Sequence, residues 1–263
     1  MLISCLCPTF NRFTGTHSTF LMNEAVESFH NQAIPSGVDR ELIVLNDTPN
    51  QRIEYDHPKV KIINLDERMR TLSDKLVRMI EVAQGDFLCR WDDDDINLPW
   101  RLKFSLEKLL ECGQDEWRPS NYWYDDGALH HVDRPGNTHV MALWKRSILD
   151  RIGGYPAGLS GNEDQAFNKR VHEIGIREHG DHLAIADMFY LYRWGVSHWH
   201  LSGQADWSSP SPHQGHWDSI GKRTIQHGTF TLRPHWRHDY TRLAIKKVDL
   251  IETGHASERV VTR

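Results

Sequence analysis

The sequence lacks any long hydrophobic run. Its apolar stretches, such as Leu42–Leu45, span only a few residues, whereas a helix that crosses a bilayer needs about 20. The N-terminus also lacks a basic region followed by a longer apolar segment, so we expect no signal peptide. These absences predict a cytoplasmic protein without a transmembrane segment, and peripheral attachment at the inner membrane surface is compatible with them.

The sequence is also poor in cysteine and in net charge. Its four cysteines show no CxxC spacing, and we expect buried thiols in a reducing compartment. The net charge of −5 argues against a protein that binds nucleic acid through its whole surface. The 263 residues allow one large α/β domain, or one domain with a small appendage.

Strand and helix patterns alternate in the first half of the chain. Such alternation predicts βαβ units and a mostly parallel sheet. The expected helices cover residues 18–32, 71–83 and 99–112, and the expected strands are Leu2–Cys7, which Pro8 ends, Glu41–Leu45, Val60–Leu65 and Asp86–Trp91.

Polar residues follow three of these strands. Ligands of open α/β sheets bind beyond the carboxyl ends of the strands, so we expect these residues to converge. They are Thr9, Asn11 and Arg12 after the first strand, Asp47 after the second, and Asp92–Asp95 after the fourth.

The second half is less regular, and 17 His and 10 Trp residues crowd toward its end. For the tryptophans, core packing is the first interpretation. We expect short strands at 121–124, 139–143 and 187–192, and helices at 145–152 and 163–174. The predicted catalytic domain spans residues 1–205, with a nucleotide-sugar half to about 103 and an acceptor half after it. Residues 206–263 form an appendage or a wrap-around tail.

Four adjacent aspartates, Asp92–Asp95, require compensation of their charge. Close carboxylates repel one another by about 1 kcal/mol or more per pair, and a cation removes that cost. Alternation along a strand end places Asp92 and Asp94 on one side, where they suit a hard divalent ion. A calcium loop of the EF-hand kind is excluded because Asn97 and Lys103 stand where Gly and Glu are needed. A solvated acidic turn is the alternative.

Four segments together resemble family 2 glycosyltransferases, in the order and with the spacing of that family. Cys5–Arg12 resembles the first strand with its P-T-[YF]-N-R ending, and Leu42–Asp47 resembles the second strand. Gly85–Leu102 resembles the segment G-[DE]-[FY]-I-x-x-x-D-x-D-D-x-x-x-P-x-R-L, and Gly161–Asp164 resembles the later E-D motif. The resemblance covers roughly residues 1–200, and it implies an A-type glycosyltransferase fold.

The resemblance also implies a donor site for a nucleotide-sugar, usually a UDP-sugar, with Mn²⁺ or Mg²⁺. Asp94 would bind the metal directly, and Asp92 would face the ribose or a metal-bound water. Asp93 stands at a variable position, and we expect Asp93 and Asp95 to be mainly structural. The other nucleotide-sugar residues implied are Thr9 and Arg12 near the base and ribose, Asn11 in the same loop, Asp47 on the base and Lys75 near the diphosphate.

The chemistry that the resemblance implies is inverting transfer to a hydroxyl of a glycan or another acceptor. Asp164 matches the catalytic base, and a carboxylate suits this role when it reaches the acceptor hydroxyl. Glu163 would orient the acceptor, although both carboxylates also suit a helix N-terminus. His198 and His200 follow in a region where members place a metal or diphosphate ligand, and His200 is the preferred choice.

Two other functions remain open. The tail carries basic and aromatic residues between 222 and 247, for which a solvated or packed tail is the first interpretation. Contact with nucleic acid, an anionic lipid or an acidic glycan is the alternative, and it motivates an acceptor such as a hydroxylated base in DNA or a protein side chain. A non-catalytic nucleotide-sugar-binding protein is the third hypothesis, and the intact Asp92, Asp94 and Asp164 argue against it. A nucleotidyltransferase would usually need a Gly-rich basic phosphate loop, but residues 9–16 hold only Gly15 and Arg12.

Overall fold

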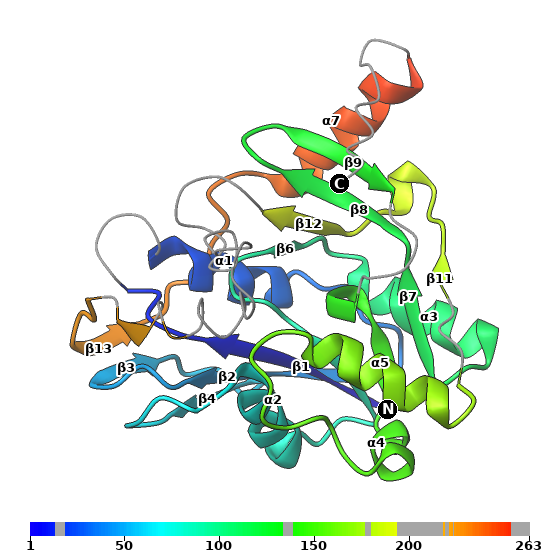
Figure 1. The fold of residues 1–263 in the computed structure, drawn as a ribbon. Helices are drawn as coiled ribbons and strands as arrows, with labels where there is room; N and C mark the ends of the chain where they lie inside the picture. The colour runs from blue at the N-terminus through cyan, green and yellow to red at the C-terminus, as the bar shows by residue number, and fades with distance from the viewer. Residues whose placement is uncertain are drawn as a thin grey trace.

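A seven-stranded, mostly parallel sheet organises the molecule (Figure 1). The computed structural model describes residues 1–13, 19–133, 139–176, 180–193, 218, 221–222 and 224–253. Four neighbouring strands run parallel, and an antiparallel strand, β10, separates them from β7 and β11. In spatial order the strands are β11 (Gly180–Asp181), β7 (Glu116–Pro119), β10 (Leu143–Lys145), β5 (Phe87–Arg90), β1 (Leu2–Thr9), β2 (Asp39–Asn46) and β4 (Val60–Asn64).

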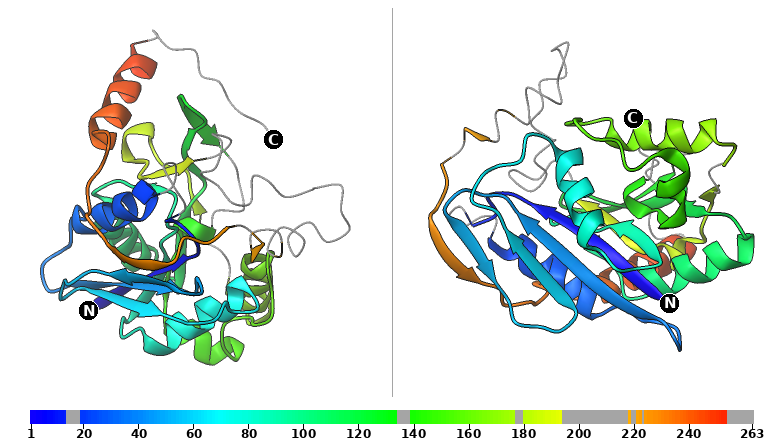
Figure 2. Two further views of the ribbon diagram at one scale, coloured as in Figure 1. Left: turned by 90° about the vertical axis from the view of Figure 1, so that its left-hand side faces the viewer. Right: turned by 90° about the horizontal axis from the view of Figure 1, so that it is seen from below.

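Helices cover both faces of this sheet (Figure 2). Alternate residues of β1 point to opposite faces, so that Cys5 and Cys7 join one core cluster and Leu6 joins the other. The first cluster contains residues of α1 (Thr19–His30) and α3 (Arg101–Cys112). The second contains residues of α2 (Leu72–Val82), α4 (Ser147–Ile152) and α5 (Glu163–Glu173).

A second, four-stranded sheet lies on the side of α1 and α3. Its spatial order is β6 (Ile96–Asn97), β12 (Tyr190–Arg193), β8 (Asn121–Asp125) and β9 (Leu129–Asp133). Four tryptophans, Trp91, Trp117, Trp123 and Trp144, are almost fully buried, so the expectation of core packing is confirmed for them.

The C-terminal part of the described chain returns to the N-terminal half. Strand β13 (Gly228–Thr231) pairs in parallel with β3 (Gln51–Glu54). Helix α7 (Tyr240–Glu252) follows and projects from the body of the molecule (Figure 1). Its first turn is held at Glu24 of α1, whose Oε1 accepts hydrogen bonds from Tyr240 Oη at 2.8 Å and from Arg237 Nε at 3.2 Å.

The first strand continues past Pro8, which we expected to end it. Proline lacks a backbone N–H and is tolerated where no ladder bond is needed. The Trp91 N–H donates to Leu6 O, so even-numbered residues of β1 face β5, and that pairing ends at Leu6. The missing N–H of Pro8 therefore costs no bond, and β1 continues to Thr9 on its β2 side.

The other differences concern short elements. The strand expected at 139–143 is a 3-10 turn, η2 (His139–Met141), followed by β10, because Ala142 N donates to His139 O and closes a turn. The strand expected at 187–192 begins at Tyr190, after a second 3-10 turn, η3 (Ile185–Asp187). The third expected helix begins at Arg101 rather than at Pro99. In the described residues, no helix has the length and apolar character required to cross a bilayer.

Candidate active site

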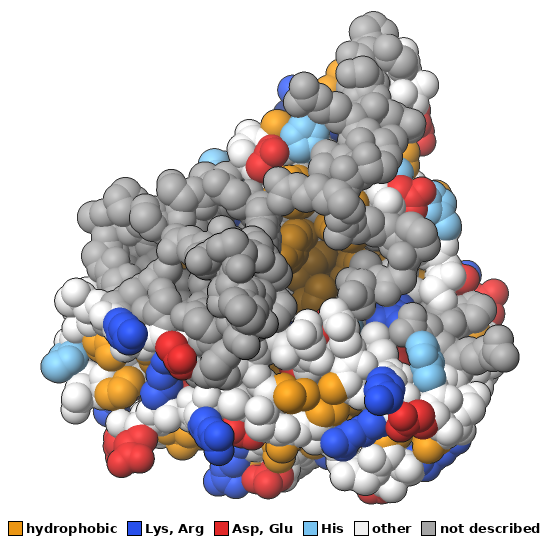
Figure 3. Space-filling model, in the orientation of Figure 1, with side chains coloured by type: hydrophobic (Ala, Val, Ile, Leu, Met, Phe, Trp, Pro, Cys, Tyr) orange, Lys and Arg blue, Asp and Glu red, His pale blue; other side chains and the backbone are white. Residues whose placement is uncertain are grey.

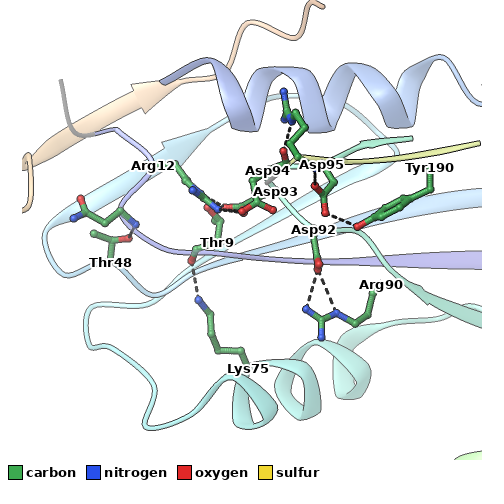
Figure 4. Close-up of polar contacts among 12 residues, drawn as sticks. Thr9, Arg12, Thr48, Lys75, Arg90, Asp92, Asp93, Asp94, Asp95 and Tyr190 are labelled. Carbon is green, nitrogen blue, oxygen red and sulfur yellow. Dashed lines mark hydrogen bonds and ion pairs between the residues drawn. The ribbon is translucent and has the colours of Figure 1, made fainter. Parts of the chain in front are cut away.

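The polar residues that follow β1, β2 and β5 meet at one edge of the sheet, as the topology predicts (Figure 4). The end of β1 lies beside the end of β2, where Thr9 pairs with Asn46. The two following loops are joined directly, because Asn11 N donates to Thr48 Oγ1 at 2.7 Å. Asn11 has a φ of 51°, a left-handed conformation that asparagine tolerates better than most residues.

Arg12 binds two members of the aspartate run. Its Nε and Nη2 donate to the two carboxylate oxygens of Asp93 at 2.9 and 2.7 Å, and Nη2 also donates to Asp94 Oδ2 at 2.7 Å. All three side chains are buried. Burial raises the pKa of Asp93, but the charge of Arg12 outweighs it and the pKa is lowered. The resemblance places Arg12 near the base and ribose; here it supplies the positive charge that the crowded carboxylates require.

Asp47 and Lys75 form a second buried ion pair. Lys75 Nζ donates to Asp47 Oδ1 at 2.7 Å and to the carbonyl oxygen of Thr9 at 2.8 Å. Met69 N donates to the other carboxylate oxygen of Asp47 at 2.9 Å. Lys75 is placed by α2, whose first turn is capped by the side chain of Thr71. Both residues assigned to the donor by resemblance therefore lie at the strand ends, bound to each other.

Arg90 joins the aspartate run to the E-D motif. Its guanidinium donates to Asp92 Oδ1 at 2.9 and 3.2 Å and, through Nη1, to Glu163 Oε1 at 2.8 Å. Glu163 opens α5 after Asn162, which has a φ of 59°. Glu163 is buried, whereas the next residue, Asp164, is only partly buried. The two motifs, about 70 residues apart in the sequence, thus lie side by side.

Asp95 is bound on the inner side of the run. Tyr190 Oη donates to Asp95 Oδ2, and Arg193 N donates to Asp95 Oδ1 at 2.8 Å. Burial, followed by the charges of Asp94 and Asp92, raises the pKa of Asp95 well above its usual range. Arg193 also donates to Glu24 Oε2 at 2.5 Å, so Asp95 connects the run to β12 and α1.

Arg90, Tyr190, Glu24 and Arg193 belong to this network, and sequence reasoning assigned none of them a role. Arg90 stands inside the motif Gly85–Leu102, where its conspicuous position between Cys89 and Trp91 was the available signal. Glu24 and Arg193 carry no local signal, because each belongs to an element of ordinary composition and they are 169 residues apart.

The strand alternation that was expected to place Asp92 and Asp94 on one side is not found, because β5 ends at Arg90 and Asp93 and Asp94 lie in a turn. Arg12 binds Asp93 and Asp94 together, whereas Arg90 binds Asp92. Asp92 and Asp94 are the members of the run that could hold a divalent cation.

Asp92 Oδ1 is bound by Arg90 and Asp94 Oδ2 by Arg12, and within the described part of the chain the second oxygen of each carboxylate has no hydrogen-bond donor. Two protein oxygens with open positions for phosphate oxygens suit Mg²⁺. In the part of the chain that is described, no group of three or more His, Cys, Asp or Glu side chains could hold a metal. His198 and His200 lie outside the described residues.

Two hollows adjoin this edge. A cavity of about 450 Å³ is lined by Phe10 and Pro49, which follow β1 and β2, by Arg68, and by residues near the start of the described C-terminal segment. On the face seen in Figure 3, the surface is hollowed between α5 and β12, and hydrophobic side chains form its floor. The first of these hollows borders the loops that follow β1 and β2, next to the strand ends.

No protein-family model and no curated protein sequence matches the chain. Solved structures do match, and among them is S. aureus TarS, with a TM-score of 0.56, 16% identity and coverage of 73% of this chain and 37% of TarS. Structures of TarS 1–349 in complex with UDP and with UDP-GlcNAc give the same TM-score and identity. This chain covers 60% and 58% of those two chains, less than two thirds of their length. The similarity and the sheet order confirm the predicted fold class, an α/β A-type glycosyltransferase fold with a mostly parallel sheet flanked by helices.

Proposed function

We propose that this chain is a glycosyltransferase that moves a sugar from a UDP-sugar to an acceptor hydroxyl with inversion at the anomeric carbon. The observation that carries the proposal is the junction of the aspartate run with the E-D motif through Arg90. By resemblance, Asp92, which follows β5, is assigned to the donor and Glu163, which begins α5, to the acceptor, and Arg90 binds both. Two similar structures were solved with UDP and UDP-GlcNAc, which supports a uridine nucleotide as the donor.

Asp164 is the proposed base. Its neighbour Glu163 is buried and held by Arg90, which leaves the partly buried Asp164 as the carboxylate that an acceptor can reach. Asp164 takes the proton of the acceptor hydroxyl as the oxygen forms a bond to the anomeric carbon. The bond from that carbon to the diphosphate breaks, and its electron pair leaves with the nucleoside diphosphate.

Asp92 and Asp94 are the proposed metal ligands. Each has one carboxylate oxygen committed to an arginine and one left for a cation. A bound Mn²⁺ or Mg²⁺ supplies positive charge that stabilises the departing diphosphate. Asp92 and Asp94 would hold the metal ion just beyond the end of β5. Arg90 fixes the orientation of the Asp92 carboxylate, and Arg12 fixes that of Asp94.

A thermal-shift screen tests the donor and the metal together. Ligands that bind the native state stabilise it by about 2.7 kcal/mol at 100 times the dissociation constant. We expect UDP-sugars to raise the melting temperature of the wild-type chain, more so with Mn²⁺, and we expect Asp94→Asn to lose the extra effect of Mn²⁺. Stabilisation by no nucleotide-sugar, with or without Mn²⁺, would contradict the proposed function.

A further inference from the structure

The described C-terminal segment lies against the loops that follow β1 and β2. Asn11 Nδ2 donates to Thr224 O at 3.1 Å, and Gln51 Nε2 donates to Gln226 O at 2.9 Å. The rings of Phe13 and Phe230 stack with their centroids 4.7 Å apart. Strand β13 then adds to β3 (Figure 1). Residues more than 200 positions from β1 therefore border the edge where the donor is proposed to bind.

This segment supplies one side of the cavity at that edge. The cavity measures about 450 Å³, a size within the usual range for small-molecule sites. One side is formed by the loops after β1 and β2 and by the residues before α2, and the other by the C-terminal segment. The lining of the cavity includes Phe10, Pro49 and Arg68 on the first side and Asp218, Gly221 and Lys222 on the second.

An aromatic ring and a cation are fixed together within this cavity. The guanidinium of Arg68 lies 4.5 Å from the centroid of the Phe10 ring. Burial lowers the pKa of Arg68, and the nearby charges of Asp47 and Asp218 oppose that shift. Gly221 approaches the same side chain so closely that a Cβ on it would lie 2.0 Å from Arg68 Nη1. The two sides of the cavity are thus in direct contact.

The cations of the site differ in whether their charge is already balanced. Arg12, Lys75, Arg90 and Arg193 all form ion pairs with buried or largely buried carboxylates. Lys222 forms no ion pair with any carboxylate that the structure describes, and it is exposed at the cavity. A diphosphate that enters here needs positive charge, and Lys222 is placed to provide it without breaking a buried pair.

We propose that Lys222 binds the diphosphate of the nucleotide donor and that Gly221 and Lys222, together with residues 224–226, form one wall of the nucleotide pocket. The proposal rests on the proposed function. It adds a donor-binding residue that lies outside residues 1–200, the part of the chain covered by the sequence resemblance.

Calorimetric titration with UDP and with uridine tests this role. Lys222→Ala should weaken the binding of UDP about tenfold, the size of one charge-assisted contact, and leave the affinity for uridine unchanged. Lys222→Arg should restore most of the affinity for UDP. Lys246→Ala is the matched control, because Lys246 is an exposed lysine of α7 and is absent from the cavity lining.

Each result of this titration is decisive. Equal UDP affinity in the wild-type chain and in Lys222→Ala contradicts the inference and leaves the proposed function intact. An equal loss for UDP and uridine also contradicts it, because a diphosphate contact acts on UDP alone. A wild-type chain that does not bind UDP contradicts both the inference and the proposed uridine-nucleotide donor.

Discussion

At the scale of single residues, the four adjacent aspartates have four different environments. Asp93 is bound at both oxygens by Arg12, and Asp94 at one. Asp92 shares Arg90 with Glu163, and Asp95 is bound by Tyr190 and the backbone of β12. The repulsion expected from the sequence is therefore relieved by arginines and hydrogen bonds. The free oxygens of Asp92 and Asp94 are what remains for a metal.

Replacement of Arg12 tests this balance of charge. Removal of one partner from a buried ion pair costs about 3–5 kcal/mol, so Arg12→Ala should lower the free energy of unfolding by that amount. A divalent cation should compensate in part, and Mn²⁺ should raise the melting temperature of Arg12→Ala more than that of the wild-type chain. The control is Arg78→Ala, which breaks an exposed pair with Glu81 and should cost less than about 1 kcal/mol. Equal stability of the two variants would refute the account.

His30 gives the protein a predictable dependence on pH. Its Nε2 lies 2.9 Å from Tyr55 Oη, and its ring centroid lies 4.5 Å from that of His57. Burial, followed by the charges of His57 and Arg40, lowers the pKa of His30 to about 4. In the unfolded chain, His30 takes up a proton near pH 6.5, whereas in the folded protein it stays neutral down to about pH 4. The folded state is therefore not penalised above about pH 6.5, and it loses stability relative to the unfolded chain as the pH falls from about 6.5 to about 4.

Denaturant titrations at pH 7 and pH 5 measure this effect. The free energy of unfolding should fall from pH 7 to pH 5 in both proteins. The fall should be about 1 kcal/mol smaller in His30→Gln than in the wild-type chain, a value that allows for solvent screening of the half-buried His30. The same fall in both proteins would show that His30 does not carry this part of the pH dependence.

At the scale of elements, one close approach of the backbone fixes β5 beside β1. Gly85 N donates to Ser4 Oγ at 2.8 Å. A Cβ at Gly85 would lie 2.6 Å from Ser4 N and 2.7 Å from Phe87 O. These backbone atoms belong to the paired strands, so they cannot move without disturbing the sheet. Because the aspartate run follows β5 directly, this glycine also positions the site.

Gly85→Ala should therefore destabilise the protein by about 1–3 kcal/mol, the usual cost of overpacking. Gly180→Ala is the matched control, because a Cβ there would meet only Arg118 O at 3.7 Å, an ordinary contact. Urea denaturation of both variants gives the comparison. If Gly85→Ala proves no less stable than Gly180→Ala, the backbones of β1 and β5 leave room for a Cβ at Gly85 and the close approach is contradicted.

The elements that could be predicted from sequence are those with strong local patterns. Strand β2 and helix α2 were expected within one or two residues of their bounds, because hydrophobic periodicity and caps are local signals. Strands β3 and β13 were not expected, since each has four residues and pairs with a partner about 177 positions away. The convergence of the loops after β1, β2 and β5 could be predicted from the parallel topology. The ion pairs within the site could not be predicted in this way. Side-chain orientation decides those pairs, and a linear pattern does not contain it.

At the scale of the whole molecule, Glu24 of α1 joins the N-terminal half to two later segments of the described chain. Glu24 is fully buried, and it binds Arg193 of β12 as well as Arg237 and Tyr240 near the start of α7. Arg237, one of the basic tail residues, is therefore used within the fold. Binding of nucleic acid by this tail stays a prediction from sequence.

The most direct test of the central claim separates turnover from binding in Asp164→Asn. The wild-type chain is incubated with the UDP-sugar that stabilises it most. Hydrolysis of this UDP-sugar, in which water replaces the acceptor, is measured by the release of UDP. General-base catalysis contributes about 10²–10⁴-fold, so we predict a loss of at least about 100-fold in Asp164→Asn with unchanged affinity for UDP. Asp150→Asn, at an exposed position of α4, should behave as the wild type. Full turnover by Asp164→Asn would contradict the assignment of the base.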